Sequence, residues 1–476
     1  MLLQQIYDDS LSQYAYLIGC PKSGEAVLVD PERDIDRYLK LASDNDLAIT
    51  AVAETHIHAD YLSGVREFLD HDSKVEAYLS GVTNDDDWRY NWAEDHDRVT
   101  LLKDGDRFAI GNVTLVARHT PGHTPEHLMF LVYDLGVTDC KAEPFCALTG
   151  DFVFVGSLGR PDLLDTAAGE KGTSKDAAKD LYSSLDAFGE IPEFTLVLPA
   201  HGAGSSCGKA LGSIPFTSAG YENRFNDLIV TASEKGQDSF VEEILDGQSE
   251  PPMYFARMKE QNRDGIPPLG DLIRPPKLDS SEAQSLAENS GPDGPMVLDT
   301  RSDRRDFMDT HLKHSLHAPL GSKFSEAAGS YVKPENEIYL VVSSENDVEK
   351  AVRQLVRIGL DDVKGYFLWP ELAADSNLKS SIGSIKTKET SEIDPGKDHV
   401  LDVRSKDEYE EDHIPDAVNV PHTRLRADSG DLPQQNGNAW TVHCGSGVRA
   451  ALASSYLGRL GYDVIYADGD YENWKK

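Results

Sequence analysis

The chain has 476 residues, more than the ~100 to 150 residues of a typical domain, so we expect two to four domains. Its 46 Lys and Arg against 82 Asp and Glu give a formal net charge of −36. This charge repels polyanions and argues against nucleic acid and acidic membranes as partners. No apolar run reaches the ~18 residues of a membrane span, and no leader pattern opens the sequence, so we expect a cytoplasmic protein.

The acidic residues are spread along the whole chain rather than gathered in a tail. This distribution is similar to the solvated surfaces of salt-adapted proteins, and an acidic protein of an ordinary cell is the alternative. The cysteines form an odd set without paired spacing, which argues against a disulfide framework. They are Cys20, Cys140, Cys146, Cys207 and Cys444. Each thiol therefore needs its own explanation.

Up to about residue 245, short apolar runs rich in β-forming residues alternate with turns and predict strands. These runs lie at 14–20, 26–30, 48–56, 113–120, 128–135, 145–151 and 195–202. Three of them carry a candidate ligand at or next to their last residue, namely His56, Asp151 and His201, and His123 lies in the turn after the fourth. Strand ends are where sheets commonly place chemistry, so we expect these residues at one edge.

Proline and glycine accumulate further on, which predicts an exposed linker at 246–268. Beyond it the sequence repeats: MVLDTR at 296–301 returns as HVLDVR at 399–404, an offset of 103 residues. This period is too long for a solenoid and predicts a duplicated domain. We expect the two copies at 269–380 and 390–476, joined by a polar segment.

The run THIHADY places His56, His58 and Asp60 directly after a predicted strand. Imidazole and carboxylate groups suit zinc or iron, although a hydrogen-bonded turn is the alternative for this run alone. Three further polar clusters, HTPGHT, TGD and PAHG, each follow an apolar strand. In this order the four motifs resemble those of the metallo-β-lactamase superfamily. The resemblance covers residues 1–245 and implies an αβ/βα sandwich with the metal at one edge of its sheets.

Members with two metals carry His after the Asp of the first motif, where this chain has Tyr61. That departure disfavours a binuclear hydrolase. The resemblance is closer to the persulfide dioxygenases, which implies one Fe²⁺ per chain bound by His56, His123 and Asp151. Two imidazoles and one carboxylate leave positions open for dioxygen and substrate. The remaining motif residues would then orient ligands, water or substrate, or be remnants of a two-metal ancestor. These residues are His58, Asp60, Tyr61 and His201.

Two residues outside the metal motifs are further candidates. Arg160, in a segment similar to the GR-x-D of the persulfide dioxygenases, either orients a substrate carboxylate or stabilises its loop through Asp162. Cys207 lies six residues beyond His201 in a loop rich in Gly and Ser. It either takes part in catalysis, by accepting a sulfane sulfur or by being oxidised, or it is a passive buried cysteine.

Near the end of the sequence, Cys444 follows a predicted strand at 438–443 and opens a predicted helix. Backbone N–H groups of such a loop and the positive end of the helix stabilise a thiolate, and Arg449 adds a cation. The loop residues that we expect to contact the transferred sulfur are Gly445, Ser446, Gly447 and Val448. The loop length favours a rhodanese over a phosphatase, and the segments LDVRS and HIPDAVNVP also resemble rhodaneses.

The first copy of the repeat has no cysteine at the corresponding loop, since none occurs between Cys207 and Cys444. We therefore predict an inactive rhodanese-like scaffold, with a surface that could serve a homo-oligomer. Ser343 or Ser344 is a poor substitute nucleophile because no base lies nearby in the sequence.

The combination resembles the persulfide dioxygenase–sulfurtransferase fusions. It implies oxidation of a low-molecular-weight persulfide by O₂ to sulfite at iron, and transfer of sulfur through a Cys444 persulfide to sulfite, giving thiosulfate. A zinc thioester hydrolase similar to glyoxalase II, fused to a sulfurtransferase, is one alternative. A non-catalytic sulfur carrier or redox protein is another.

Overall fold

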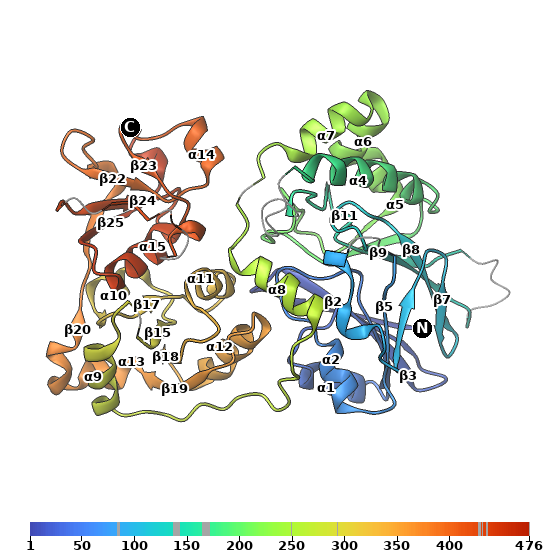
Figure 1. The fold of residues 1–476 in the computed structure, drawn as a ribbon, viewed down its shortest axis with the longest axis horizontal. Coiled ribbons are helices and arrows are strands. Elements are labelled where there is room, and N and C mark those ends of the chain that lie inside the picture. Colours follow the sequence, from blue (N-terminus) through green and yellow to red (C-terminus); the bar gives the residue numbers. More distant parts are fainter. Residues whose placement is uncertain are drawn as a thin grey trace. The chain divides into compact units, whose positions relative to one another are not determined.

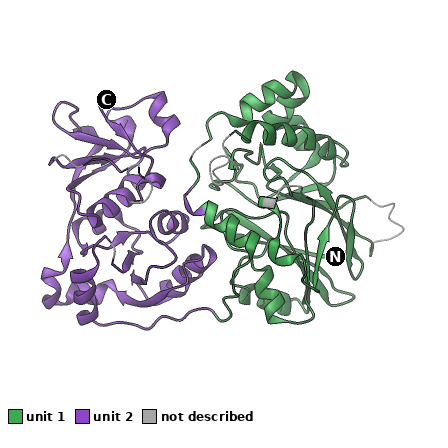
Figure 2. Cartoon of the chain, viewed as in Figure 1, with its two compact units in different colours: residues 1–251, 255–271 green, residues 252–254, 272–476 purple. Residues whose placement is uncertain are grey.

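The structure is a computed structural model that describes residues 1–82, 86–136, 143–163, 172–248, 250–292, 294–426, 430, 432–434 and 437–475. Cys140 lies outside these residues. The chain forms two compact units, residues 1–251 with 255–271 and residues 252–254 with 272–476 (Figure 2). In the described part of the chain, no helix is long and apolar enough to cross a membrane.

Unit 1 is built on two six-stranded sheets. The order of the first is β1-β2-β3-β4-β5-β6, and the order of the second is β14-β13-β10-β9-β8-β7. Figure 1 labels β2, β3 and β5 of the first sheet and β7, β8 and β9 of the second. The strands of the first sheet are β1 (Leu2–Asp8), β2 (Gln13–Cys20), β3 (Glu25–Val29), β4 (Ala48–Ala53), β5 (Glu76–Ser80) and β6 (Val99–Leu102). Those of the second are β7 (Arg107–Ile110), β8 (Val113–His119), β9 (Leu128–Asp134), β10 (Cys146–Gly150), β13 (Leu196–Pro199) and β14 (Thr217–Ser218). A hairpin of β11 (Val153–Phe154) and β12 (Ser157–Leu158) completes the unit's strands in its described part.

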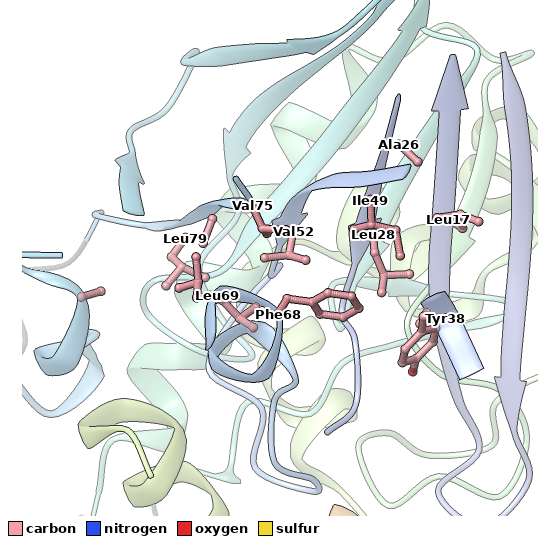
Figure 3. Close-up of a cluster of buried hydrophobic side chains, with 14 of the residues drawn as sticks. Leu17, Ala26, Leu28, Tyr38, Ile49, Val52, Phe68, Leu69, Val75 and Leu79 are labelled. Carbon is pink, nitrogen blue, oxygen red and sulfur yellow. The ribbon is translucent and has the colours of Figure 1, made fainter. Parts of the chain in front are cut away.

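Strand β2 shows how the layers are built, because its successive side chains are buried on opposite faces. Ala15 and Leu17 join a cluster with Tyr38 and Phe68 of the covering helices, whereas Tyr16 joins the core between the sheets. Figure 3 shows Leu17, Tyr38 and Phe68 in the first of these clusters. A third cluster packs the second sheet against further helices. The predicted αβ/βα sandwich is therefore confirmed.

Helices cover both outer faces of the sandwich. The first sheet is covered by α1 (Asp36–Asp44) and α2 (Val65–His71), and the second by α4 (Ser174–Gly189), α5 (Ala219–Phe225), α6 (Asp227–Lys235) and α7 (Gln237–Leu245). Two short 3₁₀ helices are η1 (Asp86–Trp88) and η2 (Asn91–Ala93). All seven strands predicted for this region are present, as β2, β3, β4, β8, β9, β10 and β13.

The segment at 246–268, predicted as a linker without an element of its own, contains helix α8 (Tyr254–Asp264). Proline and glycine at the two ends of the segment led to the linker prediction, although the residues between them are mostly good helix formers. Residues 255–271 belong to unit 1. Lys259 of this helix is buried and lies over the ring of Trp88, 3.8 Å from its centroid. The linker prediction is therefore wrong for residues 255–268, which pack as part of unit 1.

Unit 2 contains two sheets with the same strand order, β17-β15-β18-β19 and β23-β22-β24-β25, the second extended by β21. The first half comprises α9 (Ser280–Asn289), β15 (Met296–Asp299), α10 (Arg304–Asp309), β16 (His311–Leu312), β17 (Leu316–His317), α11 (Phe324–Tyr331), β18 (Ile338–Val342), α12 (Asn346–Arg357), β19 (Val363–Leu368), α13 (Trp369–Ala374), η3 (Ser376–Ser380) and β20 (Ile382–Gly383). The second comprises β21 (Lys386–Glu389), η4 (Thr390–Glu392), β22 (His399–Asp402), α14 (Lys406–Glu411), β23 (Val418–Asn419), η5 (His422–Arg424), β24 (Trp440–His443), α15 (Val448–Arg459), β25 (Val464–Asp468) and η6 (Tyr471–Asn473). The segment predicted as a polar joint thus supplies a strand, β21.

The repeated sequence forms the same buried contact in both halves. Arg301 pairs with Asp299, and Arg404 pairs with Asp402, each through two guanidinium nitrogens and both carboxylate oxygens. Such a bidentate pair compensates for the burial of both charges. The duplication seen in the sequence is therefore also a duplication of structure.

If the acidic excess is salt adaptation, the unfolding temperature should rise steeply with KCl. The net charge of −36 makes the folded chain repel itself, and the screening length falls from about 30 Å at 0.01 M to about 3 Å at 1 M salt. A thermal melt at a series of KCl concentrations between these limits measures the effect. A flat curve would contradict the interpretation.

Candidate metal centre and cysteine loop

The three predicted metal ligands come together at the ends of strands. His56 follows β4, His123 lies in the turn between β8 and β9, and Asp151 directly follows β10. One ligand atom of each lies within 4.8 Å of the others. Asp151 Oδ2 is 3.3 Å from His123 Nε2 and 3.9 Å from His56 Nε2. All three side chains are buried. The predicted ligands therefore form one compact, buried cluster with their ligand atoms close together.

Hydrogen bonds fix which nitrogen of His123 is free. Its Nδ1 lies 2.9 Å from the backbone carbonyl of Arg160, and since a carbonyl only accepts, Nδ1 carries the proton. His56 Nδ1 lies 2.9 Å from the hydroxyl of Thr55. In both rings Nε2 is the nitrogen nearer the Asp151 carboxylate. Partners of this kind hold metal-binding histidines in orientation.

The electrostatics of this cluster fit a cation. Burial lowers the pKa of His123 to about 3 and that of His56 well below its usual value, so both rings are neutral ligands. Burial also raises the pKa of Asp151 to about 6. Both oxygens of the Asp151 carboxylate are buried without a hydrogen bond to the described residues. A bound divalent cation would satisfy this carboxylate, which otherwise bears a desolvation penalty.

His127 was not identified from the sequence, yet it positions Asp151. Its Nε2 accepts a hydrogen bond of 3.1 Å from the backbone N–H of Asp151, and its Nδ1 lies 2.8 Å from the hydroxyl of Thr120. The ring centroid is 5.1 Å from that of His56. The sequence signal was its spacing of four residues from His123, within a run that already held two histidines.

Replacing His127 by Leu, which has similar bulk and no acceptor, should lower metal affinity by about 10- to 100-fold. The backbone of Asp151 would lose the partner that fixes it. Metal retained after dialysis against a chelator measures the effect, and His127→Gln, which restores an acceptor, should recover part of it. His119→Leu is the matched control, since that ring bonds the Pro125 carbonyl. Equal losses from both leucine variants would contradict this role.

Helix α8 holds the first metal motif in place. The side-chain amide of Asn262 donates to the backbone carbonyls of His58 and Tyr61, at 2.8 and 2.7 Å. Its oxygen accepts from the backbone N–H of Ser63 at 2.9 Å. A single amide therefore fixes the loop that carries His56 and Asp60. The sequence separation of about 200 residues hid this contact from motif analysis.

His58 and Tyr61 are both directed to Asp30. His58 Nε2 lies 3.1 Å from the Asp30 carboxylate, and the Tyr61 hydroxyl donates to the Asp30 backbone carbonyl at 3.2 Å. Burial alone would lower the pKa of His58, but Asp30 raises it to about 9. Asp30 also accepts the N–H of Thr55, next to His56, at 2.8 Å. These contacts support the predicted orienting role.

Asp60 and His201 form a second group with Cys207, whose ligand atoms lie within 4.8 Å of one another. His201 Nε2 lies 3.5 Å from Asp60 and 3.5 Å from Asp151 Oδ1, while its Nδ1 donates to the Ser12 carbonyl. Burial raises the pKa of Asp60 to about 6 and raises that of the Cys207 thiol well above its usual value. Cys207 thus lies beside the metal ligands, but as a protonated thiol unless a cation binds.

Arg160 is almost completely buried and is held by its own loop. Its guanidinium makes two hydrogen bonds to the Asp162 carboxylate, at 2.8 and 2.6 Å, and one of 3.1 Å to the Ser206 carbonyl. Its backbone N–H donates to the Cys207 carbonyl. Of the two predicted roles, these contacts favour stabilisation of the loop over direct binding of a substrate carboxylate.

The cysteine loop of unit 2 connects β24 to α15, as predicted. Cys444 is buried, and its Sγ accepts hydrogen bonds from the N–H groups of Gly447 (3.1 Å) and Ala450 (3.3 Å). Gly447 has φ of +88°, which a residue with a side chain rarely adopts, and it precedes the first residue of the helix, Val448. Gly445 and Ser446 complete the turn. The sulfur therefore faces backbone N–H groups, as expected of a thiolate-stabilising loop.

Arg449 is paired with a carboxylate of the same half. Its guanidinium donates to both carboxylate oxygens of Glu408, at 2.5 and 2.7 Å. Burial opposes ionisation of Glu408, but Arg449 lowers its pKa to about 2. Glu408 also accepts the N–H of Ser405 at the start of α14. Arg449 thus links the loop to α14.

Comparison with known proteins follows the same division. The metallo-beta-lactamase superfamily matches residues 9–201, and the rhodanese-like domain matches residues 388–476. The crystal structure of a metallo-beta-lactamase from Staphylococcus aureus is 33% identical and covers 77% of this chain and 99% of its own, with a TM-score of 0.66. The chain belongs to the metallo-beta-lactamase superfamily. The 77% coverage also extends beyond the match at 9–201, which spans less than half of the chain.

Curated relatives of this superfamily include two kinds of enzyme. Mitochondrial persulfide dioxygenase ETHE1 of Bos taurus and of Homo sapiens is 29% identical over 206 residues, which are 42% of this chain and 68% of theirs. Hydroxyacylglutathione hydrolase of Tolumonas auensis is 28% identical over 201 residues, 42% of this chain and 66% of its own. The two predicted domain families, metallo-beta-lactamase and rhodanese, are therefore confirmed. The chain is an enzyme that joins a metallo-beta-lactamase domain, with persulfide dioxygenase homologues, to a C-terminal rhodanese domain.

Proposed function

We propose that unit 1 oxidises the sulfane sulfur of a low-molecular-weight persulfide with O₂. The balanced reaction consumes RSSH, O₂ and water and releases RSH, sulfite and two protons. The observation that supports it is the set of His56, His123 and Asp151 with Tyr61 bonded to the Asp30 carbonyl. Because a tyrosine stands where a two-metal enzyme has a histidine, Tyr61 adds no imidazole to the site. The cluster then offers two imidazoles and one carboxylate, which is the ligand set of mononuclear ferrous oxygenases.

The chain's own residues prepare this site. The Arg160 carbonyl and the Thr55 hydroxyl orient the two neutral imidazoles, and His127 holds the backbone of Asp151. Ferrous iron bound by these side chains would supply open coordination positions for O₂ and the persulfide sulfur. Cys207, adjacent to Asp151, is the protein thiol best placed to hold a sulfane sulfur at this site.

In unit 2 we propose sulfur transfer through Cys444. Its thiolate attacks the outer sulfur of RSSH, the S–S bond breaks, and RSH leaves with the proton. Sulfite then attacks the outer sulfur of the Cys444 persulfide, and the electron pair of that S–S bond returns to Sγ as thiosulfate forms. The N–H groups of Gly447 and Ala450 are placed to stabilise negative charge on Sγ in both steps.

The deciding experiment is metal analysis of anaerobically purified protein together with oxygen uptake on adding glutathione persulfide. About one iron per chain and persulfide-dependent uptake would support the dioxygenase. Two zinc ions and no uptake would overturn it. A coenzyme A persulfide and inorganic polysulfide in parallel would identify the preferred carrier.

A zinc thioester hydrolase in unit 1 is the second candidate, and one observation favours it. Asp60, His201 and Cys207 offer a second set of ligand atoms beside Asp151, and a hydroxyacylglutathione hydrolase is among the relatives. Such enzymes activate water at zinc. Hydrolysis of S-lactoylglutathione by the zinc-loaded protein would support this candidate.

A further inference from the structure

Helix α10 of the half that lacks a catalytic cysteine contacts the cysteine loop of the other half of unit 2. Arg304 donates from Nη2 to the backbone carbonyl of Ser446, at 3.1 Å, and from Nε to the Asp468 carboxylate, at 2.9 Å. Arg305 donates to the other oxygen of Asp468. Asp468 ends β25 and is buried, so it anchors both arginines beside the loop.

The contact with Ser446 determines where an N–H group of the loop points. In a trans peptide the carbonyl of one residue and the N–H of the next point in opposite directions. The Ser446 carbonyl bonds to Arg304, and the N–H of the same peptide unit, which belongs to Gly447, points to Cys444 Sγ. The next carbonyl, of Gly447, lies 3.1 Å from the Tyr466 hydroxyl, which also contacts the Asp468 carboxylate at 2.6 Å. The carbonyls of Ser446 and Gly447 thus point away from Cys444 toward Arg304 and Tyr466, and the Gly447 N–H points to the sulfur.

The internal repeat gives an independent argument. With the offset of 103 residues, Arg304 and Arg305 correspond to Asp407 and Glu408. In the second half, Glu408 binds Arg449 of its own loop. In the first half, the corresponding positions carry the opposite charge and bind Asp468 of the other half. The first turn of the equivalent helix therefore reaches the same cysteine loop from both halves, but through different positions. Arg304, aligned with Asp407, contacts the loop directly, whereas Arg305, aligned with Glu408, binds Asp468 beside it.

We propose that Arg304 is a positioning residue for sulfur transfer at Cys444, acting through the Ser446–Gly447 peptide. This inference rests on the proposed sulfurtransferase function. When sulfite takes the outer sulfur, the S–S electron pair returns to Sγ, and the Gly447 N–H held by Arg304 stabilises the thiolate that leaves. The half without a cysteine is thus part of the catalytic apparatus. Because Arg304 acts on the N–H that stabilises the leaving thiolate, its loss should slow the chemical step more than it weakens sulfite binding.

The test compares Arg304→Ala with Arg305→Ala in the full-length protein. Both variants remove one positive charge and one bond to Asp468, but only Arg304 contacts the loop carbonyl. We expect Arg304→Ala to lower kcat for thiosulfate formation by about 10- to 100-fold, the value of a hydrogen bond to a charged group, with little change in the KM for sulfite. Arg305→Ala should change kcat by less than about threefold. Arg304→Lys, which keeps a donor, should recover part of the loss.

Alkylation of Cys444 by iodoacetamide, followed on its own peptide by mass spectrometry, provides a readout independent of turnover. Arg304→Ala should move the pH profile of this reaction to higher pH, and Arg305→Ala should leave it unchanged. Equal effects of the two alanine variants, or no effect of Arg304→Ala on either readout, would overturn the inference. If Arg304→Ala fails to fold, Arg304→Gln and Arg304→Lys take its place in both measurements. If the unmodified protein forms no thiosulfate, the sulfurtransferase proposal fails, while the alkylation profiles still decide whether Arg304 positions the loop.

Discussion

Replacing Cys444 by Ser should abolish thiosulfate formation, by at least about 10³-fold, and leave persulfide-dependent oxygen uptake intact. A serine hydroxyl is a poor nucleophile toward a persulfide and forms no S–S bond, so no sulfur is loaded. The change is nearly isosteric, and the hydroxyl oxygen can still accept from the Gly447 and Ala450 N–H groups that contact Sγ. The fold of unit 2 should therefore persist.

The measurement is paired: thiosulfate from persulfide and sulfite in one assay, and oxygen uptake from persulfide alone in another. Cys20→Ser is the control, because Cys20 also accepts a backbone N–H, from Asn112, but lies in unit 1 among core residues. It should retain both activities. Loss of oxygen uptake together with thiosulfate formation in Cys444→Ser would show that the two reactions are obligately coupled.

Every central strand of unit 1 except β5 was predictable from the sequence, whereas the edge strands were not. Strand β2 is buried on both faces and β9 over most of its length, so their sequences are continuous apolar runs. Strands β1, β6, β7 and β14 lie at sheet edges and are partly exposed. An edge strand needs only one apolar face and one paired side, so its sequence carries a weaker signal.

The ligands of the candidate site were predictable, but the residues that hold them were only partly so. His56, His123 and Asp151 stand in short motifs at strand ends, which the sequence displays directly. Asn262 acts across about 200 residues, and its contacts exist only after α8 has packed. His127 was visible as a histidine, but its bond to the Asp151 backbone depends on how two strands align. Sequence motifs thus identify the residues that would bind the metal, whereas the residues that orient them are brought into place only by the fold.

The cysteine loop shows the same limit in unit 2. The strand, the loop and the helix around Cys444 followed from local sequence. The partner of Arg449 lies 41 residues away, and the contact from Arg304 spans 142 residues. The repeat made the first half recognisable as a copy, yet its arginines became interpretable only when the structure showed Asp468 between them.

Replacing His123 by Ala should reduce bound iron from about one per chain to below about one tenth and abolish oxygen uptake, because one of three protein ligands is lost. His201→Ala is a matched comparison: both rings are buried, both donate Nδ1–H to a backbone carbonyl, and both direct Nε2 to Asp151. If unit 1 holds a single iron, His201→Ala should retain about one iron per chain even where its turnover falls. Metal analysis of both variants after anaerobic reconstitution measures this difference. A fall from two metal ions to one in His201→Ala would instead identify a binuclear centre that includes Asp60 and Cys207, and the dioxygenase proposal would give way to hydrolysis.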